Sequence, residues 1–518
     1  DQQRSGKKKK HGIHRPFVLA GSRWGILPVG NGGNDMDEAF SRELSQNQEW
    51  AKQTFGRSAD FYAKPLQIGK IECCLMLFDG LSSVEKLWQI LLRYLADECS
   101  FRKGEQLFDH ILHGSALPVE PQTITQKQQA AERLTSGFAL LFIQGCAQAI
   151  AVSVQSMQFR SVQEPLAEGE IRGSREGFTD MLRVNLSLLR RIVRSQTLVM
   201  QVQSHQGRTH TEYAVCYDSD YADPRLVQRV QEKLQKASLP FLFDSSYFVP
   251  FLHRHWQGIF QPVSYTERPI VAAARLCEGK IVVLVGGSPF ALVIPGFFAE
   301  NFESLDDYAF PAYFTAISRA LRYIAFAAAV FLPGFYVMAV SFTPEIMPPI
   351  LLKSVLKGAN QTPLSALAEM LLVLLILEIV RIAGLKMPRN TSGSVSLVAA
   401  IVIGSAGVEA GLLSSPLLLC AATAAVALYT LPKLYEQIVL LRLAVLLLCG
   451  WLGPVGLAMG MMLITSSISR ADGEGLPYLF PLHPACSGAL RDGFVRMPWP
   501  ILAKDPFTLK NSRKGKKL

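Results

Sequence analysis

Five ionisable side chains lie inside apolar segments of the C-terminal third of the chain. They are Glu369, Glu378, Arg381, Glu409 and Arg442. A charge at bilayer depth costs about 2.5–3.5 kcal/mol on the mildest scales, so such residues usually pair with one another or face a water-filled path. Rings of carboxylates in such a path favour cations. These residues therefore suit charge pairing and cation passage rather than bond making.

The spacing of these charges predicts which of them can meet. Glu378 and Arg381 are three residues apart, so they lie on one face of a helix and can form an ion pair. Glu369 precedes Glu378 by nine residues, about two and a half turns, so it lies on the opposite side of the same helix. Arg381 and Arg442 have an alternative interpretation, in which each ends a helix at the interface and extends its charge into water.

The rest of the sequence holds no recognisable catalytic or metal-binding set. The short motifs of phosphate-binding loops, zinc proteases and serine hydrolases are absent, and the nine cysteines form no CxxC pair. The histidines of "HGIH" (11–14) and "HRH" (253–255) have no cysteine or acidic companion at ligand spacing. We therefore expect no enzyme activity, no cofactor and no metal, and cysteines that remain reduced.

The apolar segments predict a polytopic membrane domain. Residues 316–470 hold ten Lys/Arg and five Asp/Glu in 155 positions, well below the 18% charged residues of the whole chain. An apolar stretch of about 20 residues is long enough to cross a bilayer. The last such stretch is longer, and Gly453-Pro454 divides it, so we expect either a kink or a return to the starting side. The expected segments are 317–342, 363–382, 395–413, 415–431 and 437–468.

The first 310 residues alternate strand-like and helix-like runs. Apolar runs that end at turn residues predict strands at 71–80 and on both sides of Gln144-Gly145. Residues 281–299 are uncharged, but Gly286-Gly287 between two runs rich in Val, Ile and Phe favours a strand hairpin over a membrane helix. Helical spacing predicts helices at 81–95 and at 179–195, the second with Thr179 as its cap. Three arginines crowd the end of that helix, where solvation is the usual outcome: Arg190, Arg191 and Arg194.

These patterns predict an α+β N-terminal region of two mixed α/β subdomains, followed by an all-α polytopic transmembrane domain. Lysine-rich ends at 7–10 and 510–518, beside a membrane domain, favour the cytoplasmic side over a nucleic-acid partner, and we expect no nucleic acid to bind. The expected divisions are a disordered basic and polar leader (1–50), a first subdomain (51–165), a second subdomain (166–312), a helical domain of four to six segments (313–470) and a basic tail (471–518).

Several blocks of the chain, in order over roughly residues 55–505, resemble the A subunits of GerA-type spore germinant receptors. One block is a signature loop that contains Arg172, Gly173, Arg175, Glu176 and Gly177. The chain departs from the family pattern at Glu170, Ser174, Gly286 and Leu374; at the last of these the family commonly has a membrane glutamate. The resembling blocks are residues 165–195, 265–295, 306–337, 378–388 ("EIVRIAGLKMP"), 407–416, 476–484 and 491–500.

The resemblance implies a multi-pass protein of the spore inner membrane with a cytoplasmic N-terminal domain and no cofactor. It implies a transporter-like B subunit and a lipoprotein C subunit as partners, and assembly of the A subunit into a homo-oligomeric cation channel that nutrients gate. The same family contains an accessory sporulation protein, and the motifs do not separate the two. A secondary transporter and a scaffold for a partner permease are further alternatives; the first would need paired broken helices in two repeats, and only Gly453-Pro454 is such a break.

Overall fold

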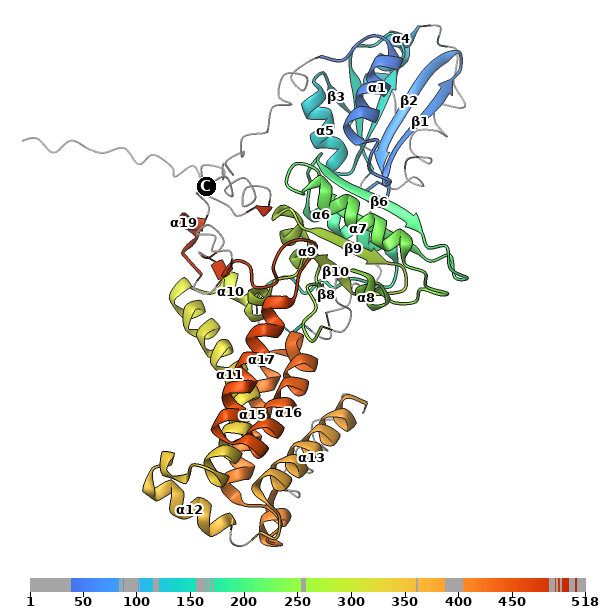
Figure 1. Cartoon of the computed structure of the whole chain (residues 1–518). Helices are drawn as coiled ribbons and strands as arrows, with labels where there is room; N and C mark the ends of the chain where they lie inside the picture. Colours follow the sequence, from blue (N-terminus) through green and yellow to red (C-terminus); the bar gives the residue numbers. More distant parts are fainter. Residues whose placement is uncertain are drawn as a thin grey trace, which may run out of the picture.

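The computed structural model consists of an elongated α/β region joined to a bundle of helices (Figure 1). The structure describes residues 39–82, 87, 101, 103–114, 121–154, 165, 168–169, 172–252, 258–359, 362–386, 404–483, 490, 492–493, 496–502 and 508–509. Most of the helix predicted at 81–95 and the first nine residues of the membrane segment predicted at 395–413 lie outside these residues.

The first α/β unit is a five-stranded antiparallel sheet with helices on both faces, in the strand order β1-β2-β4-β5-β3. Alternate residues of β2 point to opposite faces: Cys73 and Leu75 pack toward α4, and Met76 packs toward α1 and α5. Its elements are α1 (Leu44–Phe55), β1 (Phe61–Ile68), β2 (Ile71–Phe78), α4 (Gly104–Asp109), β3 (Gln122–Ile124), α5 (Lys127–Thr135), β4 (Phe138–Ile143) and β5 (Ala149–Ser153).

The second unit repeats this arrangement, since its strand order β6-β7-β9-β10-β8 is the same permutation of five antiparallel strands. Its helices also correspond: α6 and α9 cover one face, as α1 and α5 do in the first unit, and α7 covers the other, as α4 does. Its elements are α6 (Leu182–Ile192), β6 (Leu198–Ser204), β7 (Glu212–Asp218), α7 (Pro224–Lys236), η3 (Ser245–Phe248), α8 (Val249–Leu252), β8 (Ser264–Thr266), α9 (Pro269–Cys277), β9 (Ile281–Val285) and β10 (Ala291–Ile294). The α/β region is therefore a tandem duplication of one fold.

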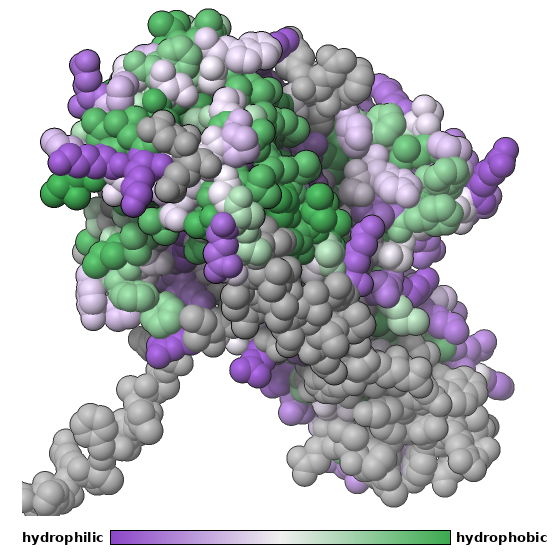
Figure 2. Space-filling view, turned by 90° about the horizontal axis from the view of Figure 1, so that it is seen from below, coloured by the Kyte–Doolittle hydropathy of each residue, from purple (hydrophilic) through white to green (hydrophobic). Residues whose placement is uncertain are grey.

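The helical region is built around α11, which packs mainly against α15 and α16 (Figure 1). Gly453 has a φ of +58°, which suits glycine, and the chain reverses there so that α17 packs back along α16. Seen from the end farthest from the α/β region, hydrophobic side chains cover much of the described surface of these helices (Figure 2). The elements are η4 (Phe298–Phe302), α10 (Asp306–Ala309), α11 (Ala312–Ser341), η5 (Pro344–Ile346), α12 (Pro349–Ala359), α13 (Ala366–Lys386), α15 (Ser415–Tyr429), η6 (Pro432–Leu434), α16 (Tyr435–Leu452), α17 (Pro454–Arg470) and α19 (Trp499–Leu502).

The helical region has the composition of a membrane domain. Among the described residues, two helices are long and apolar enough to cross a bilayer, Ala312–Ser341 and Pro432–Leu452. The shorter helix α15 is also apolar. Helix α13 has 21 residues, but every 18-residue stretch of it contains Glu378, Arg381 and at least one further charge. The helical region therefore has two candidate membrane spans, and α13 carries more charge in such a stretch than either of them.

The predicted fold class is confirmed: two sheets with helices precede a helical region. The hairpin at Gly286-Gly287 and the break at Gly453 are also confirmed. The leader prediction extends too far, because α1 begins at Leu44 and its Trp50 and Phe55 are buried in the first unit. Thr179 does not cap α6; the helix starts at Leu182, and Thr179 is held instead by the side chain of Asn185.

Candidate membrane charge site and its cavity

Glu378 and Arg381 form the charge pair that their spacing predicts. Atom NH2 of Arg381 lies 3.0 Å from Oε1 of Glu378. Tyr435, at the start of α16, donates its hydroxyl hydrogen bond to the same carboxylate oxygen. The guanidinium carbon of Arg381 lies 3.6 Å from the centroid of the Tyr435 ring, within cation–π distance. The pair is therefore anchored to a second helix, and α13 and α16 are joined by one polar cluster.

Arg442 belongs to the same region but plays a different part. It lies about two turns beyond Tyr435 on α16, is only 5% exposed, and interacts electrostatically with Glu378 and Tyr435. It does not end a helix, because α16 continues to Leu452. The interpretation of Arg442 as a helix end at the interface is therefore wrong, and Arg442 is a buried cation facing the Glu378 cluster.

The other two predicted acids lie elsewhere. Glu369 is 2% exposed, and its carboxylate accepts the backbone N–H of Ser414, the residue that precedes α15. It thus satisfies one of the free N–H groups at the start of a helix, where a negative charge is also favoured by the helix dipole. Glu409 is exposed, in a helical stretch at 404–409. Only three of the five predicted residues therefore come together: Glu378, Arg381 and Arg442.

A cavity of about 820 Å³ lies where the second α/β unit meets the ends of α13, α15 and α16. Arg381 and Tyr435 of the charge cluster are part of its wall. Its wall holds five carboxylates and three cationic side chains, so negative charge is in excess. The carboxylates are Glu168, Asp244, Glu267, Glu303 and Glu436, and the cations are Arg322, Arg381 and Lys433.

The cavity bridges the two parts of the molecule. Lys433, just before α16, lies 3.2 Å from Glu168 of the α/β region in an ion pair. Burial raises the pKa of Asp244, but hydrogen bonds from Ser246 and Ser288 outweigh burial and hold that pKa below its usual value. Asp244 is therefore ionised at neutral pH. The cavity therefore carries fixed negative charge at the end of the helical region that faces the α/β region.

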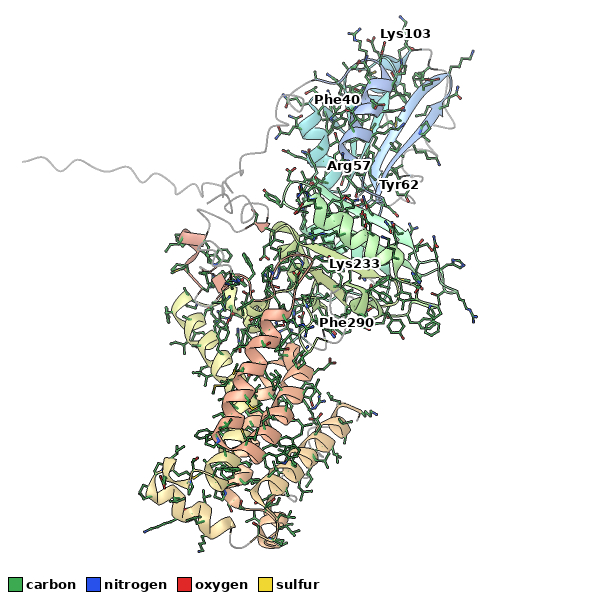
Figure 3. All side chains as sticks on the ribbon, viewed as in Figure 1. Phe40, Arg57, Tyr62, Lys103, Lys233 and Phe290 are labelled. Atoms are coloured by element: carbon green, nitrogen blue, oxygen red, sulfur yellow. The ribbon has the colours of Figure 1, made fainter. Side chains whose placement is uncertain are left out.

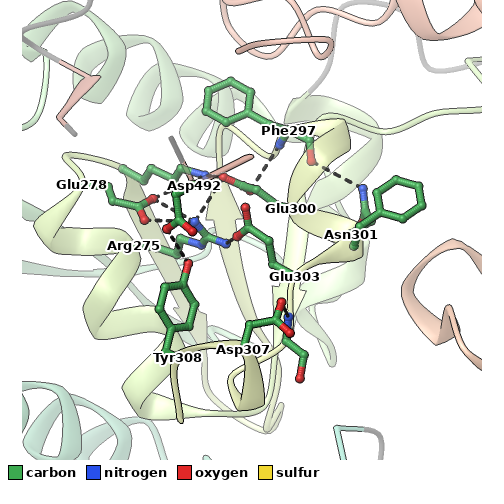
Figure 4. A network of polar contacts seen from close by, with 12 residues as sticks. Arg275, Glu278, Phe297, Glu300, Asn301, Glu303, Asp307, Tyr308 and Asp492 are labelled. Atoms are coloured by element: carbon green, nitrogen blue, oxygen red, sulfur yellow. Dashed lines mark hydrogen bonds and ion pairs between the residues drawn. The ribbon is translucent and has the colours of Figure 1, made fainter. Parts of the chain in front are cut away.

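A network of buried charges lies beside this cavity (Figure 4). Arg275 of α9 contacts Glu278 at 3.0 Å and Glu303 at 2.7 Å. The ammonium of fully buried Lys280 pairs with Glu300. Burial alone would raise the pKa of Glu300, but Arg275 and Lys280 beside it lower that pKa below its usual value. Burial raises the pKa of Glu303, by contrast, to about 7, because its pairing with Arg275 only partly offsets desolvation.

Asp307 joins this network to the first long helix. Its carboxylate is 2% exposed and accepts from Nε of Arg319 at 2.8 Å and from both terminal nitrogens of Arg322 at 2.9 Å. Arg319 also pairs with Asp492 of the C-terminal segment at 3.2 Å. Arg496 donates to the Asp307 carbonyl oxygen at 2.6 Å. The start of α11 and the C-terminal segment therefore meet at Asp307.

The signature loop packs against this junction. The backbone N–H of Arg172 donates to Asp306 at 2.7 Å, and its guanidinium lies 4.8 Å from the ring centroid of Phe310. Gly173 has a φ of +123°, and a Cβ there would lie 2.8 Å from Leu305. Glu176 pairs with Arg191 of α6. The loop thus connects α6 to the segment that enters the helical region, and a side chain at Gly173 would collide with that segment.

The sequence did not predict the ion pairs that join the two α/β units to each other and the second unit to the C-terminal segment. Arg190, predicted to be solvated, is 1% exposed and pairs with Asp60 of the first unit at 2.8 Å. Figure 3 shows Arg57 and Tyr62, on either side of Asp60 in the sequence, at the meeting of the two units. It also labels Lys233 of α7, which pairs with Glu474 of the C-terminal segment at 2.5 Å. The sequence feature that could have indicated the buried pair is the run of three arginines at the end of α6.

A repeated α/β region that contacts an apolar helical bundle around a charged cavity defines a membrane protein with a large extramembrane domain. The model of the Bacillus/Clostridium GerA spore germination proteins matches residues 49–508. The chain therefore belongs to this family.

Curated relatives align with nearly the whole chain. It is 29% identical to an uncharacterised membrane protein, YfkQ, of Bacillus subtilis, over 93% of this chain and 95% of the relative. It is 28% identical to spore germination protein KA of B. subtilis, over 89% of this chain and 85% of the relative. It is 27% identical to stage V sporulation protein AF of the same organism, over 89% and 93%. Among solved structures, the N-terminal domain of the A subunit of the Bacillus megaterium germinant receptor GerK3 aligns over 50% of this chain and 98% of that domain, at 20% identity and a TM-score of 0.38.

Proposed function

We propose that this protein acts in spore germination as the A subunit of a nutrient germinant receptor, and that its helical region forms or gates a cation path. Membership of the GerA family supports the role in germination. The observation that carries the cation path is the charge cluster of Glu378, Arg381 and Tyr435 at the wall of a cavity with excess negative charge. In this proposal the protein spans the spore inner membrane several times, with its α/β region in the cytoplasm.

The proposed mechanism uses the α/β region as a gate. The cavity gathers cations at the end of the bundle, and Glu378 is the next fixed carboxylate at the side of Arg381. While Glu378 is paired with Arg381 and Tyr435, its charge is neutralised and its position is fixed. Movement of the α/β region would pull on Lys433 through Glu168, and so on the start of α16, which carries Tyr435. Loss of the Tyr435 contact would leave Glu378 free to face a cation.

A homo-oligomer, a transporter-like B subunit and a lipoprotein C subunit complete the proposed receptor. The path would be built from several copies, so that Glu378 of each copy contributes to a ring of carboxylates that favours cations. An accessory sporulation role is a second candidate, because stage V sporulation protein AF is about as similar to this chain as spore germination protein KA is. A scaffold or transporter subunit for a partner permease would not need Glu378 to be charged.

The test measures potassium release from liposomes that contain the full chain, alone and with its B and C partners. Glu378→Gln should reduce the flux about tenfold or more, because one fixed charge per subunit is lost from a path of low dielectric. Arg381→Gln should preserve or raise the flux, because it frees Glu378. Glu232→Gln on the exposed face of α7 is the matched control. Equal losses in the Glu378 and Arg381 variants would show that the pair is only structural, and wild-type flux in Glu378→Gln would refute the path.

A further inference from the structure

A second cavity, separate from the charge site, opens between α16 and α17. Its volume is about 640 Å³. Because the chain reverses at Gly453, the end of α17 at Arg470 lies at the same end of the bundle as the start of α16. Residues 258–260 and Pro262 of the α/β region line the cavity at that end. It is therefore a groove along two membrane-region helices with a mouth beside the α/β region.

The chemistry of the groove changes along its length. Ala444 and Leu448 of α16 and Leu463 of α17 line the accessible part of an apolar section. The base of this section is formed by side chains that are buried in the bundle core, Leu441, Val445 and Ile464. Toward the mouth the wall becomes polar, with two neighbouring serine hydroxyls and then one cation and one carboxylate. From Gly460 to Arg470 the helix rises about 15 Å at 1.5 Å per residue. The polar wall residues are Ser466, Ser467, Arg470 and Asp472.

The two charges at the mouth are free to bind a ligand. In the part of the chain that the structure describes, Arg470 forms no ion pair, with Asp472 or with any other carboxylate. Asp472 accepts only a backbone N–H, from Gly475 at 3.0 Å. Arg470 and Asp472 line one mouth without pairing, so together they are complementary to a zwitterionic group. An anionic ligand alone would be repelled by Asp472.

An apolar channel with a zwitterionic mouth matches one kind of molecule in a membrane. The acyl chain of a phospholipid is complementary to the apolar section, and basic pockets between membrane helices are known to bind lipid headgroups. The phosphate of phosphatidylethanolamine would meet Arg470, and its ammonium would meet Asp472. The surrounding surface is lipid-like in character, since Met462 is 72% exposed and Leu463 is 53% exposed.

We propose that the groove between α16 and α17 binds one phosphatidylethanolamine molecule. The acyl chain lies along Ala444 and Leu463, the phosphate lies on Arg470, and the amine lies on Asp472. The lipid thereby covers the exposed side of the contact between α16 and α17, and it ties their shared end to residues 258–260 of the α/β region. This site is independent of Glu378 and of the proposed cation path.

The test uses native mass spectrometry of the full chain, purified in detergent and offered equal amounts of phosphatidylethanolamine and phosphatidylglycerol. The wild type should retain phosphatidylethanolamine over phosphatidylglycerol by about fivefold, the order expected from one exposed ion contact. Arg470→Gln should lower retention of both lipids about tenfold, because a charge-assisted contact to phosphate is lost. Asp472→Asn should remove the preference between them. Ala444→Phe, at an exposed wall position, should exclude both lipids by filling the groove.

Lys353→Gln is the matched control, since Lys353 is an exposed cation on α12 outside the groove, and its lipid retention should equal that of the wild type. Retention unchanged in Arg470→Gln or Ala444→Phe would overturn the site, and an unchanged preference in Asp472→Asn would overturn the assignment of the amine. If soluble glycerophosphoethanolamine displaced the bound lipid as well as phosphatidylethanolamine does, the groove would hold the headgroup and no acyl chain. Disulfide linkage of two copies through Ser466→Cys would instead assign the groove to a second copy.

Discussion

Replacing Asp60 by Asn tests how the two α/β units are held together. Arg190 of the second unit uses all five of its N–H donors. Nε and NH2 donate to the Asp60 carboxylate at 2.8 and 3.0 Å, and NH2 also donates to Ser58 at 2.8 Å. NH1 donates to the carbonyl oxygens of Ser195 and Leu198 at 3.2 and 3.0 Å. Asp60 is the only carboxylate of this set, so Asp60→Asn leaves a buried guanidinium without its counter-charge.

The expected cost is large because neither partner reaches water. The side chains of Arg190 and Asp60 are 1% and 7% exposed. Removing one partner of such a buried pair costs about 3–5 kcal/mol, since the remaining charge stays desolvated. With a urea m-value of about 3 kcal/mol/M, this loss would shift the unfolding midpoint of the α/β region by about 1–2 M. The double variant Asp60→Asn, Arg190→Met should recover much of the loss, because no buried charge remains.

The assay is urea unfolding of the full chain in detergent, followed by the fluorescence of tryptophans that include Trp50, which is buried in the first unit. Glu232→Gln, an exposed change on α7, is the control and should leave the midpoint in place. A loss below about 1 kcal/mol for Asp60→Asn, or a double variant that is less stable than either single variant, would refute the buried-pair reasoning.

Three further outcomes are expected. Burial raises the pKa of Glu303 from 4.5 to about 7, so the folded protein holds a proton that the unfolded chain releases; this stabilisation is complete below pH 4.5 and is lost as the pH rises through 7. Melting temperatures across pH 4.5–8 should show this fall in the wild type and not in Glu303→Gln, and parallel curves would contradict it. Gly453→Ala should cost about 1–3 kcal/mol, because φ is +58° and the new Cβ would lie 2.8 Å from Phe342; an unchanged melting temperature would count against a required reversal there. Glu369→Gln should be tolerated, whereas Glu369→Ala should cost about 1–3 kcal/mol by leaving the Ser414 N–H unpaired; equal melting temperatures would exclude this contact.

Local patterns in the sequence were sufficient for the elements that depend on neighbouring residues. Gly286-Gly287 between two β-branched runs identified the β9–β10 hairpin, although its hydropathy resembled a membrane helix. Gly453-Pro454 identified the break between α16 and α17, because glycine and proline act through the backbone at their own positions. The pairing of Glu378 with Arg381 also follows from spacing on one helix.

The sequence could not identify contacts whose partners are far apart in the chain. Asp60 and Arg190 are separated by 130 residues, and only the folded arrangement of two sheets brings them together. The arginine run on α6 therefore indicated a solvated helix end, as such runs usually do. The duplication was equally hidden, because β2 (IECCLMLF) and β7 (EYAVCYD) share burial and strand order but few residues.

The use of all five N–H donors of Arg190 in hydrogen bonds also has a mechanical consequence. Turning one α/β unit against the other would break several hydrogen bonds at once, so both units move together as one stiff arm. The arm contacts the bundle through Glu168, which pairs with Lys433, and through Arg172, which donates to Asp306 just before α11. A partner that binds near α4, at the far end of the arm (Figure 1), would therefore act on these two contacts at a distance, through the stiff pair of units.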